Sequence, residues 1–258
     1  MVDNSQTNSW LLDVGLRQDA VLRLFCFPYA GGSASVFRSW ADVLPTEVLL
    51  CPVQLPGREG RLKEPLFTSL PALVKAIAEA LVPSFGQPFA FFGHSLGAVI
   101  CFELARLLQK EHGIEPACLY VSGSPAPQLR SERLPTFNLP ESEFVAELRR
   151  LNGTPATVLD HPELMSLMLP IIRADFEISQ TYSYLPDEPL SCPINAYGGL
   201  RDPEVSRESL EAWRGQTTAS FSFKIFPGDH FFIHSARSAF LSELTRDIES
   251  LLRRLVGG

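Results

Sequence analysis

The residues best suited to chemistry lie in the segment Gly93-His94-Ser95-Leu96-Gly97, which has the spacing G-x-S-x-G. An apolar stretch over residues 88–92 precedes this segment, and a helical pattern over residues 98–109 follows it. In a strand–turn–helix context the spacing is typical of a nucleophile elbow, a sharp turn that holds a serine clear of the sheet. Glycines two residues to either side avoid collisions with the adjoining strand and helix. The motif is short enough to recur by chance, and a buried serine in a glycine-rich turn is the alternative interpretation. The pattern nevertheless predicts Ser95 as the nucleophile of an acyl-transfer reaction.

A serine nucleophile needs a general base, and His230 is the histidine best placed to serve. It lies within residues 227–232, directly after the last predicted strand, where a loop can deliver an imidazole to the elbow. His230 and His234 also have the i, i+4 spacing of a helical metal pair, but Phe231 stands where a zincin has its glutamate. No third ligand is evident, so we expect no metal site. The remaining histidines have plainer interpretations. His94 is part of the elbow itself, and His112 ends a helix. His161 lies in a turn of the predicted lid, and His234 is a packing or surface residue.

The base in turn needs a carboxylate that holds its tautomer and stabilises the imidazolium. Asp202 follows the penultimate predicted strand, and the resulting order Ser, Asp, His is that of α/β-hydrolases. Asp229 is an alternative, but it adjoins His230, and neighbouring side chains diverge. An aspartate before Pro203 could also be a simple turn former. Three such residues in order after three strands favour the catalytic triad.

Acyl transfer also needs hydrogen-bond donors for the oxyanion. The backbone N–H of Leu96, at the start of the elbow helix, is one predicted donor. The loop after the first strand, residues 27–32, should supply the second because its two glycines let the backbone bend towards the site. We predict Ala30 as this donor, with Tyr29 as the second choice. A plain tight turn is the alternative for the glycine pair.

Strand and helix patterns alternate through most of the chain, which predicts an α/β fold with a mostly parallel central sheet and helices on both faces. The predicted strands cover residues 21–27, 47–53, 89–92, 118–121, 193–197 and 221–226. The predicted helices, besides that after the elbow, cover residues 34–44, 70–83, 208–213 and 239–255.

The alternation is interrupted over roughly residues 125–190, where two helical patterns follow each other without a strand. We interpret this segment as a helical lid insertion in a single domain that spans residues 1–258, because lids lie over the strand ends that carry a site. Methionine adapts to varied apolar partners, so we predict Met165, Met168 and Ile172 as substrate contacts. Packing on the domain is the alternative, and we expect the insertion to be part lid and part core. Pro170 should kink its helix.

Composition indicates what class of protein carries these residues. The chain has 258 residues, of which 45% are hydrophobic and 20% charged, as in proteins with a large core. No apolar run approaches the roughly 20 residues of a membrane span, and residues 1–9 lack the order of a signal peptide. Five scattered cysteines indicate reduced thiols in a cytoplasmic protein. The net charge of −7 argues against a nucleic-acid partner.

Several segments together resemble the type II thioesterases, the free-standing α/β-hydrolases that accompany polyketide and nonribosomal peptide synthases. The elbow is generic to hydrolases, but Gln54-Leu-Pro-Gly-Arg-Glu59 and Leu151-Asn-Gly-Thr-Pro155 are more specific. The likeness runs from about Leu22 to the C-terminal helix. It departs from the family pattern at residues 122–127, where we would expect a basic residue after Gly123. The other segments that carry the likeness are residues 27–33, 93–97, 169–175 and 228–232.

The resemblance implies hydrolysis of acyl groups held as thioesters on the phosphopantetheine arm of carrier proteins, which clears stalled or mis-primed units. Phosphopantetheine then enters as part of the substrate, and the chemistry requires no metal or redox cofactor. We expect a monomer whose partner is an acyl or peptidyl carrier protein. The candidate carrier contacts are Arg58, Arg61, Lys63, Arg130 and Arg133.

Three alternatives remain at the level of sequence. One is a chain-terminating medium-chain fatty acyl thioesterase or a general esterase on the same fold. Another is a hydrolase-fold binding module without activity, which the filled triad positions disfavour. The third is an excised terminal domain of a synthase, and the polar start of the chain leads us to expect a free-standing protein instead.

Overall fold

A sheet of short strands, buried along their length at its middle and more exposed at the β6 edge, forms the centre of the molecule. The computed structural model describes residues 8–15, 17, 20–129 and 134–257. All five strand pairs are parallel, and the strands are ordered β2-β1-β3-β4-β5-β6. Every residue of β3 and β4 is buried, as expected for strands covered on both faces. The strands are β1 (Leu22–Phe27), β2 (Val48–Pro52), β3 (Phe89–His94), β4 (Leu119–Ser122), β5 (Ile194–Gly199) and β6 (Phe221–Phe226).

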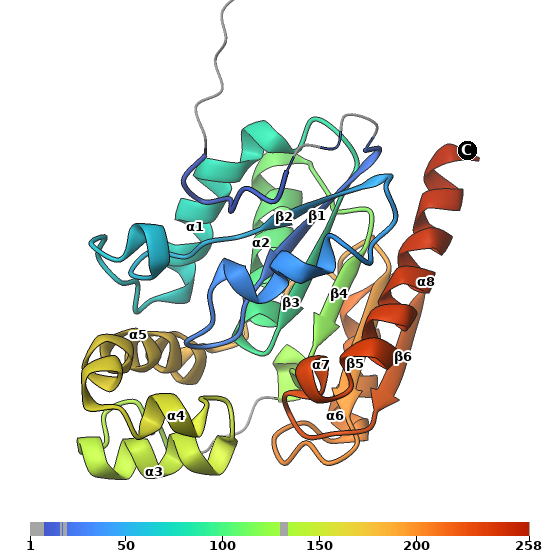
Figure 1. Cartoon of the computed structure of the whole chain (residues 1–258). Helices are drawn as coiled ribbons and strands as arrows, with labels where there is room; N and C mark the ends of the chain where they lie inside the picture. The colour runs from blue at the N-terminus through green and yellow to red at the C-terminus, as the bar shows by residue number, and fades with distance from the viewer. Residues whose placement is uncertain (1–7, 16, 18–19, 130–133, 258) are drawn as a thin grey trace, which may run out of the picture.

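Helices cover both faces of this sheet, which confirms the predicted fold class. Helices α1 and α2 pack on one face, and the 3₁₀ helix η1 and α8 pack on the other. Figure 1 shows α3, α4 and α5 together at one end of the sheet. The α-helices are α1 (Leu70–Leu81), α2 (Leu96–His112), α3 (Glu141–Leu151), α4 (Ala156–Leu159), α5 (Pro162–Thr181), α6 (Arg207–Glu211), α7 (Phe232–Ser235) and α8 (Arg237–Val256). The 3₁₀ helices are η1 (Ala34–Trp40), η2 (Glu59–Arg61), η3 (Val82–Ser84), η4 (Pro127–Leu129) and η5 (Ala212–Gln216).

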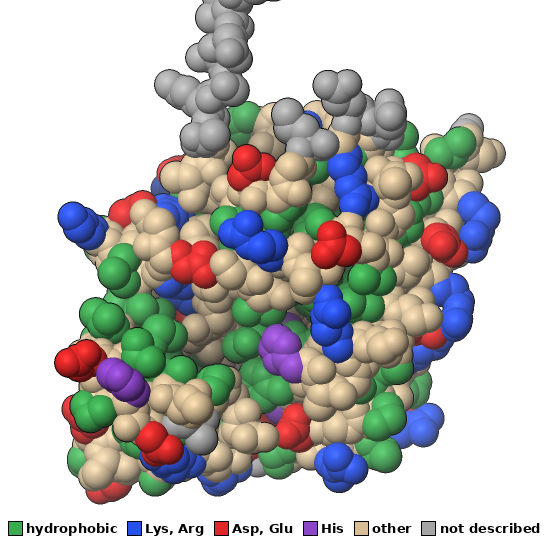
Figure 2. All heavy atoms as spheres, viewed as in Figure 1, with side chains coloured by type: hydrophobic (Ala, Val, Ile, Leu, Met, Phe, Trp, Pro, Cys, Tyr) green, Lys and Arg blue, Asp and Glu red, His purple; other side chains and the backbone are tan. Residues whose placement is uncertain are grey.

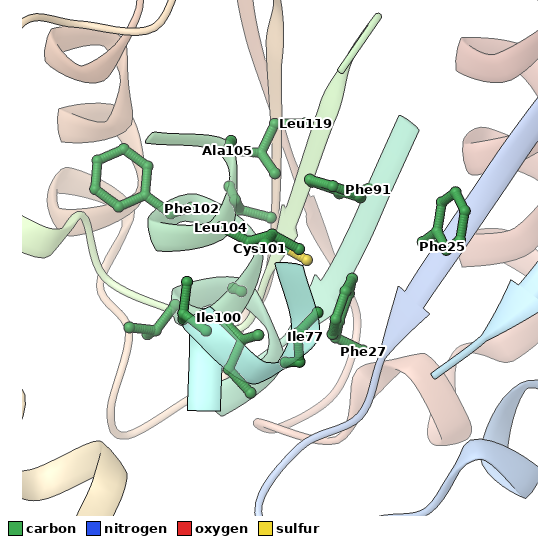
Figure 3. Close-up of a cluster of buried hydrophobic side chains, with 14 of the residues drawn as sticks. Phe25, Phe27, Ile77, Phe91, Ile100, Cys101, Phe102, Leu104, Ala105 and Leu119 are labelled. Atoms are coloured by element: carbon green, nitrogen blue, oxygen red, sulfur yellow. The ribbon is translucent and has the colours of Figure 1, made fainter. Parts of the chain in front are cut away.

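Alternation along the strands divides the core into two layers. Successive side chains of a strand point to opposite faces, so Phe25 and Phe27 of β1 join one layer while Leu24 and Cys26 join the other. In the first layer, aromatic side chains of β1 and β3 meet α1 and α2 (Figure 3). The rings of Phe27 and Phe91 pack edge to face with centroids 5.7 Å apart, a favourable arrangement for aromatic pairs.

The order of the strands places a switch point between β1 and β3. The chain leaves β1 to form β2 on one side and returns to form β3 on the other. The loops that follow β1 and β3 therefore diverge at the carboxyl end of the sheet, and ligands of open α/β folds bind in such a crevice. Ser95 and the loop of residues 28–33 lie at this point.

The insertion between β4 and β5 holds α3, α4 and α5, one short helix more than the two helical patterns predicted. It has a small apolar cluster of its own, built around Phe144, Leu148 and Met165. Helix α5 continues through Pro170. The C-terminal half of α5 also contributes Ile178 to the main core, so the insertion is anchored to the sheet domain at that end.

Two further predicted helices differ from the structure. The segment predicted as a helix over residues 34–44 forms only the 3₁₀ helix η1, and that predicted over 208–213 is divided between α6 and η5. Among the described residues, no helix combines the length and apolarity needed to cross a membrane.

The approach of α2 to the end of β1 gives a test of the fold. A Cβ at Gly97 would lie 2.1 Å from the carbonyl oxygen of Phe27, so backbone would have to move. We expect Gly97→Ala to lower the free energy of unfolding by at least about 2 kcal/mol and Tm by about 4–8 °C. Gly86 is the matched control, because a Cβ there would meet nothing within 4 Å, and Gly86→Ala should shift Tm very little. Equal Tm values for the two variants would contradict this packing.

Candidate active site

Ser95 occupies a sharp turn between β3 and α2, as the elbow motif predicts. Its φ is 55° and its ψ is −113°, a region that residues with side chains seldom adopt. The N–H of Ser95 donates to the carbonyl oxygen of Ser122 on β4 at 2.7 Å. A Cβ at Gly93 would lie 2.1 Å from the carbonyl oxygen of Gly97. The two glycines are therefore required so that the strand and the helix can approach closely around the serine.

His230 and Asp202 form a hydrogen-bonded pair. The Nδ1 atom of His230 lies 2.7 Å from Oδ2 of Asp202, whose side chain is fully buried. The other oxygen of Asp202 accepts the N–H of Glu204 at 2.8 Å, which fixes the carboxylate within its loop. An ionised carboxylate only accepts hydrogen bonds, so Nδ1 carries the proton and Nε2 is left to act as a base.

Asp229, the alternative acid, is engaged elsewhere. Its Oδ1 accepts the N–H of Phe231 at 2.9 Å, and its Oδ2 accepts the side-chain amide of Asn152 at 3.1 Å. The carboxylate thus holds the loop of His230 and connects it to the end of α3.

A cavity of about 270 Å³ brings the candidate groups together. Ser95, His230 and the loop residues Tyr29 and Ala30 line it from the sheet domain. The lid contributes apolar side chains: Leu148, Leu151, Ile172 and Phe176. Figure 2 shows hydrophobic side chains gathered beside a histidine near the centre of the face of the molecule that it presents.

Of the three predicted substrate contacts in the lid, Ile172 lines the cavity, whereas Met165 and Met168 are not among the residues that line it. Met165 is buried in the apolar cluster of the lid, and Met168 packs against that cluster. Leu148 and Phe176, rather than the methionines, join Ile172 on the face of the lid that meets the cavity.

The loop after β1 and the start of α2 place two backbone N–H groups near the serine. As the first residue of α2, Leu96 has no carbonyl one turn earlier in the helix to accept its N–H. The carbonyl oxygen of Tyr29 accepts the N–H of Gly32 at 2.8 Å. Because a trans peptide points its C=O and N–H in opposite directions, the N–H of Ala30 points out of this turn. Both groups have the chemistry of oxyanion donors, and the choice between Ala30 and Tyr29 stays a prediction.

Two other histidines pack near the site without facing Asp202. His94 is fully buried, and its Nδ1 lies 2.9 Å from the hydroxyl of Ser122. Burial holds the pKa of His94 well below its ordinary value, so this ring is neutral beside the catalytic base. His234 lies 3.0 Å from the hydroxyl of Tyr29 through its Nε2. Burial also lowers the pKa of His234. Among the described residues, no group of three or more His, Cys, Asp or Glu side chains could hold a metal ion.

Two of the predicted carrier contacts are wrong, because Arg58 and Arg61 are buried. Arg58 is 5% exposed and pairs with Asp175 of α5 through two hydrogen bonds of 2.8 Å. Arg61 is 7% exposed and donates to Glu64 and to the carbonyl oxygen of Gln54. Lys63 is exposed. Arg130 and Arg133 lie outside the described residues.

Sequence reasoning assigned no role to Asp175, nor to Gln54 and Glu59. All lie in segments that carry the family likeness, which is the one signal that could have pointed to them. In the structure Gln54 accepts the N–H of Ala34 at 3.1 Å, and Glu59 accepts the hydroxyl of Ser33 at 2.6 Å. The segment of residues 54–59 therefore supports the loop that follows β1.

Comparisons with known proteins identify the family and the fold. The thioesterase domain family matches residues 22–251. Gramicidin S biosynthesis protein GrsT of Aneurinibacillus migulanus is 45% identical over 96% of this chain and 97% of its own. The solved structure of the type II thioesterase BorB from the borrelidin biosynthetic cluster is 35% identical, with a TM-score of 0.85 over 92% of this chain and 96% of that one. The medium-chain S-acyl fatty acid synthase thioesterase of Rattus norvegicus is 32% identical over 83% of this chain and 82% of its own.

The two aspartates near His230 can be separated by mutation. Asp202→Asn should lower kcat by about 10⁴-fold, because an amide favours the wrong tautomer of the imidazole. Asp229→Asn should cost less than about 10-fold, since its oxygen can still accept the N–H of Phe231. Steady-state kinetics on a small acyl thioester would measure both. The opposite ranking of the two variants would show that the acid is Asp229.

Proposed function

The chain belongs to the thioesterase family, and on that basis we propose that it hydrolyses acyl groups held as thioesters on the phosphopantetheine arm of carrier proteins. Its task would be editing, the removal of stalled or mis-primed units from polyketide or nonribosomal peptide synthases. The observation that carries the proposal is that Ser95 and His230 line one lid-covered cavity, with His230 hydrogen-bonded to the buried Asp202 behind it. The relatives named for gramicidin S biosynthesis and for the borrelidin biosynthetic cluster support the pathway class.

In the proposed mechanism His230 removes the proton from Ser95, whose Oγ attacks the thioester carbonyl. The N–H groups of Leu96 and Ala30 would hold the oxyanion of the tetrahedral intermediate. The thiolate is a good leaving group and takes up the proton from His230 as it departs, so His230 is again free to act as a base. Water activated by His230 then hydrolyses the acyl-serine and restores the enzyme. Each step uses groups of this chain, and phosphopantetheine takes part as the substrate's own arm.

Carrier proteins are the proposed partners, with the enzyme acting as a monomer. The chain has a net charge of −7, so long-range attraction to an acidic carrier would be weak or repulsive. Recognition would then depend on local contacts at the cavity mouth and on the acyl group. The five cysteines are free and buried, which supports a cytoplasmic location.

Mass spectrometry of loaded carrier proteins tests the substrate class. Wild-type enzyme should release short or incorrect acyl groups from the phosphopantetheine arm, and Ser95→Ala should lose at least about 10⁴-fold in rate while it keeps the wild-type Tm. A fluorophosphonate probe should label Ser95 in the wild type only. Near-normal hydrolysis by Ser95→Ala would contradict the mechanism.

Chain-length kinetics distinguish the alternative, a chain-terminating medium-chain fatty acyl thioesterase. An editing enzyme should accept carrier-bound short acyl groups at least as well as medium-chain ones. A strong preference for medium chains, or for simple esters over acyl-carrier proteins, would favour the alternative.

A further inference from the structure

The lid helix α5 reaches beneath the loop that follows β1 and bonds to it through a buried carboxylate. Asp175 is 2% exposed, and its Oδ2 accepts the N–H of Gly31 at 2.7 Å. The same oxygen accepts Nη1 of Arg58 at 2.8 Å, and Oδ1 accepts Nη2 at 2.8 Å. Such a two-point pairing of guanidinium and carboxylate fixes orientation as well as distance.

Arg58 completes a clamp on the same loop. Its Nη1 also donates to the carbonyl oxygen of Gly32 at 2.9 Å. Asp175 and Arg58 thus hold the N–H of Gly31 and the C=O of Gly32, two groups on consecutive residues. We refer to these two side chains as the Arg58–Asp175 clamp.

Close packing seats α5 on the loop at the same place. Gly31 has a φ of 75°, and a Cβ there would lie 2.9 Å from Cγ1 of Ile172. Ile172 and Asp175 are three residues apart in α5, so they share one face of the helix. That face both touches Gly31 and binds its N–H, which leaves the loop little freedom to rotate its peptide groups.

The clamped peptide is next to the proposed oxyanion donor. The N–H held by Asp175 belongs to the peptide between Ala30 and Gly31, and the preceding peptide carries the N–H of Ala30. The turn bond from Gly32 to Tyr29 orients that preceding peptide, and Gly32 is itself held by Arg58. An oxyanion donor is effective only when its direction is set before charge develops.

We propose that Asp175 and Arg58 are positioning residues that hold the Ala30 N–H in its oxyanion-binding direction, so that the lid insertion forms part of the catalytic apparatus. The inference rests on the proposed acyl-transfer chemistry but not on the carrier as substrate. A buried ion pair is a poor source of net stability, because desolvation offsets its attraction. Replacing both partners with apolar residues should therefore leave the fold intact and remove only the positioning.

The test compares the double variant Arg58→Met/Asp175→Leu with the wild type on a small acyl thioester and a p-nitrophenyl ester. We expect kcat to fall by about 10²-fold, the loss typical of one oxyanion donor, with KM changed less than about 3-fold. The affinity for an acyl boronic acid, which forms a tetrahedral adduct on Ser95, should fall by a similar factor. The affinity for the unreactive amide analogue should stay at the wild-type value.

Two further variants serve as a milder test of the clamp and as a control for ion pairs elsewhere in the lid. Arg58→Lys retains the buried charge pair but cannot make the two parallel bonds, so it should lower kcat by about 10-fold with near-normal Tm. Arg149→Gln/Asp160→Asn removes an ion pair within the lid that does not touch the loop, and kcat should remain that of the wild type. If the double variant fails to fold, the lysine variant decides the question.

Wild-type kcat in a folded clamp variant would overturn the proposal, as would equal losses of boronate and amide affinity. Neither assay substrate contains a carrier protein. A negative result for the clamp variants would therefore say nothing against hydrolysis of acyl-carrier proteins by the wild type. Conversely, a wild-type enzyme that fails to hydrolyse acyl-carrier proteins would not change the conclusion about the clamp.

Discussion

Ser95 holds a backbone conformation that costs a residue with a side chain on the order of 1–3 kcal/mol. Its φ of 55° persists because elements on every side define its position. The N–H of Ser95 is bonded to β4, Gly93 lies against the first turn of α2, and Gly97 lies against the end of β1. The same contacts that impose the strain bring the start of α2 and the loop after β1 to one edge of the sheet. The cavity, the backbone donors and the approach of His230 all depend on this arrangement.

The insertion contacts the catalytic loops as well as covering them. Asp175 of α5 bonds to the loop after β1, and Asn152 at the end of α3 bonds to Asp229 in the loop after β6. Gly153 lies so close to the ring of Phe231 that a Cβ there would be 2.4 Å from it. The lid is therefore joined to the site at two separate loops.

The sequence predicted well those features that depend on local pattern. Ser95, Asp202 and His230 each come after a strand that could be recognised from the sequence, whether as a buried apolar run (β3) or as an alternating one (β6). Because all the strands are parallel, topology alone brings these residues to the same edge. Pairings between distant segments could not be predicted in this way. Arg58 looked like a surface cation because its partner, Asp175, lies far away in the sequence on an inserted helix.

Helical periodicity had a similar limit in the lid. It identified helices in the insertion, but it could not tell which of their apolar side chains, Met168 or Ile172 for example, meet the cavity. The geometry of α5 on Gly31 decides that question, because it turns Ile172 towards the sheet domain and leaves Met165 within the lid. The segment after Ser33 likewise lacked a signal that would separate a 3₁₀ helix from an α-helix.

The order of the strands has a consequence for biosynthesis of the protein itself. Ser95, the proposed nucleophile, follows β3, whereas His230, the proposed base, follows β6, which lies at the edge of the sheet beside β5. In the proposed mechanism, a ribosome-bound chain that has not yet reached residue 230 lacks the base that activates Ser95. Under that mechanism, hydrolytic activity would arise only after β6 and the loop that follows it have folded onto the sheet, and a prematurely terminated chain would have a serine without its base.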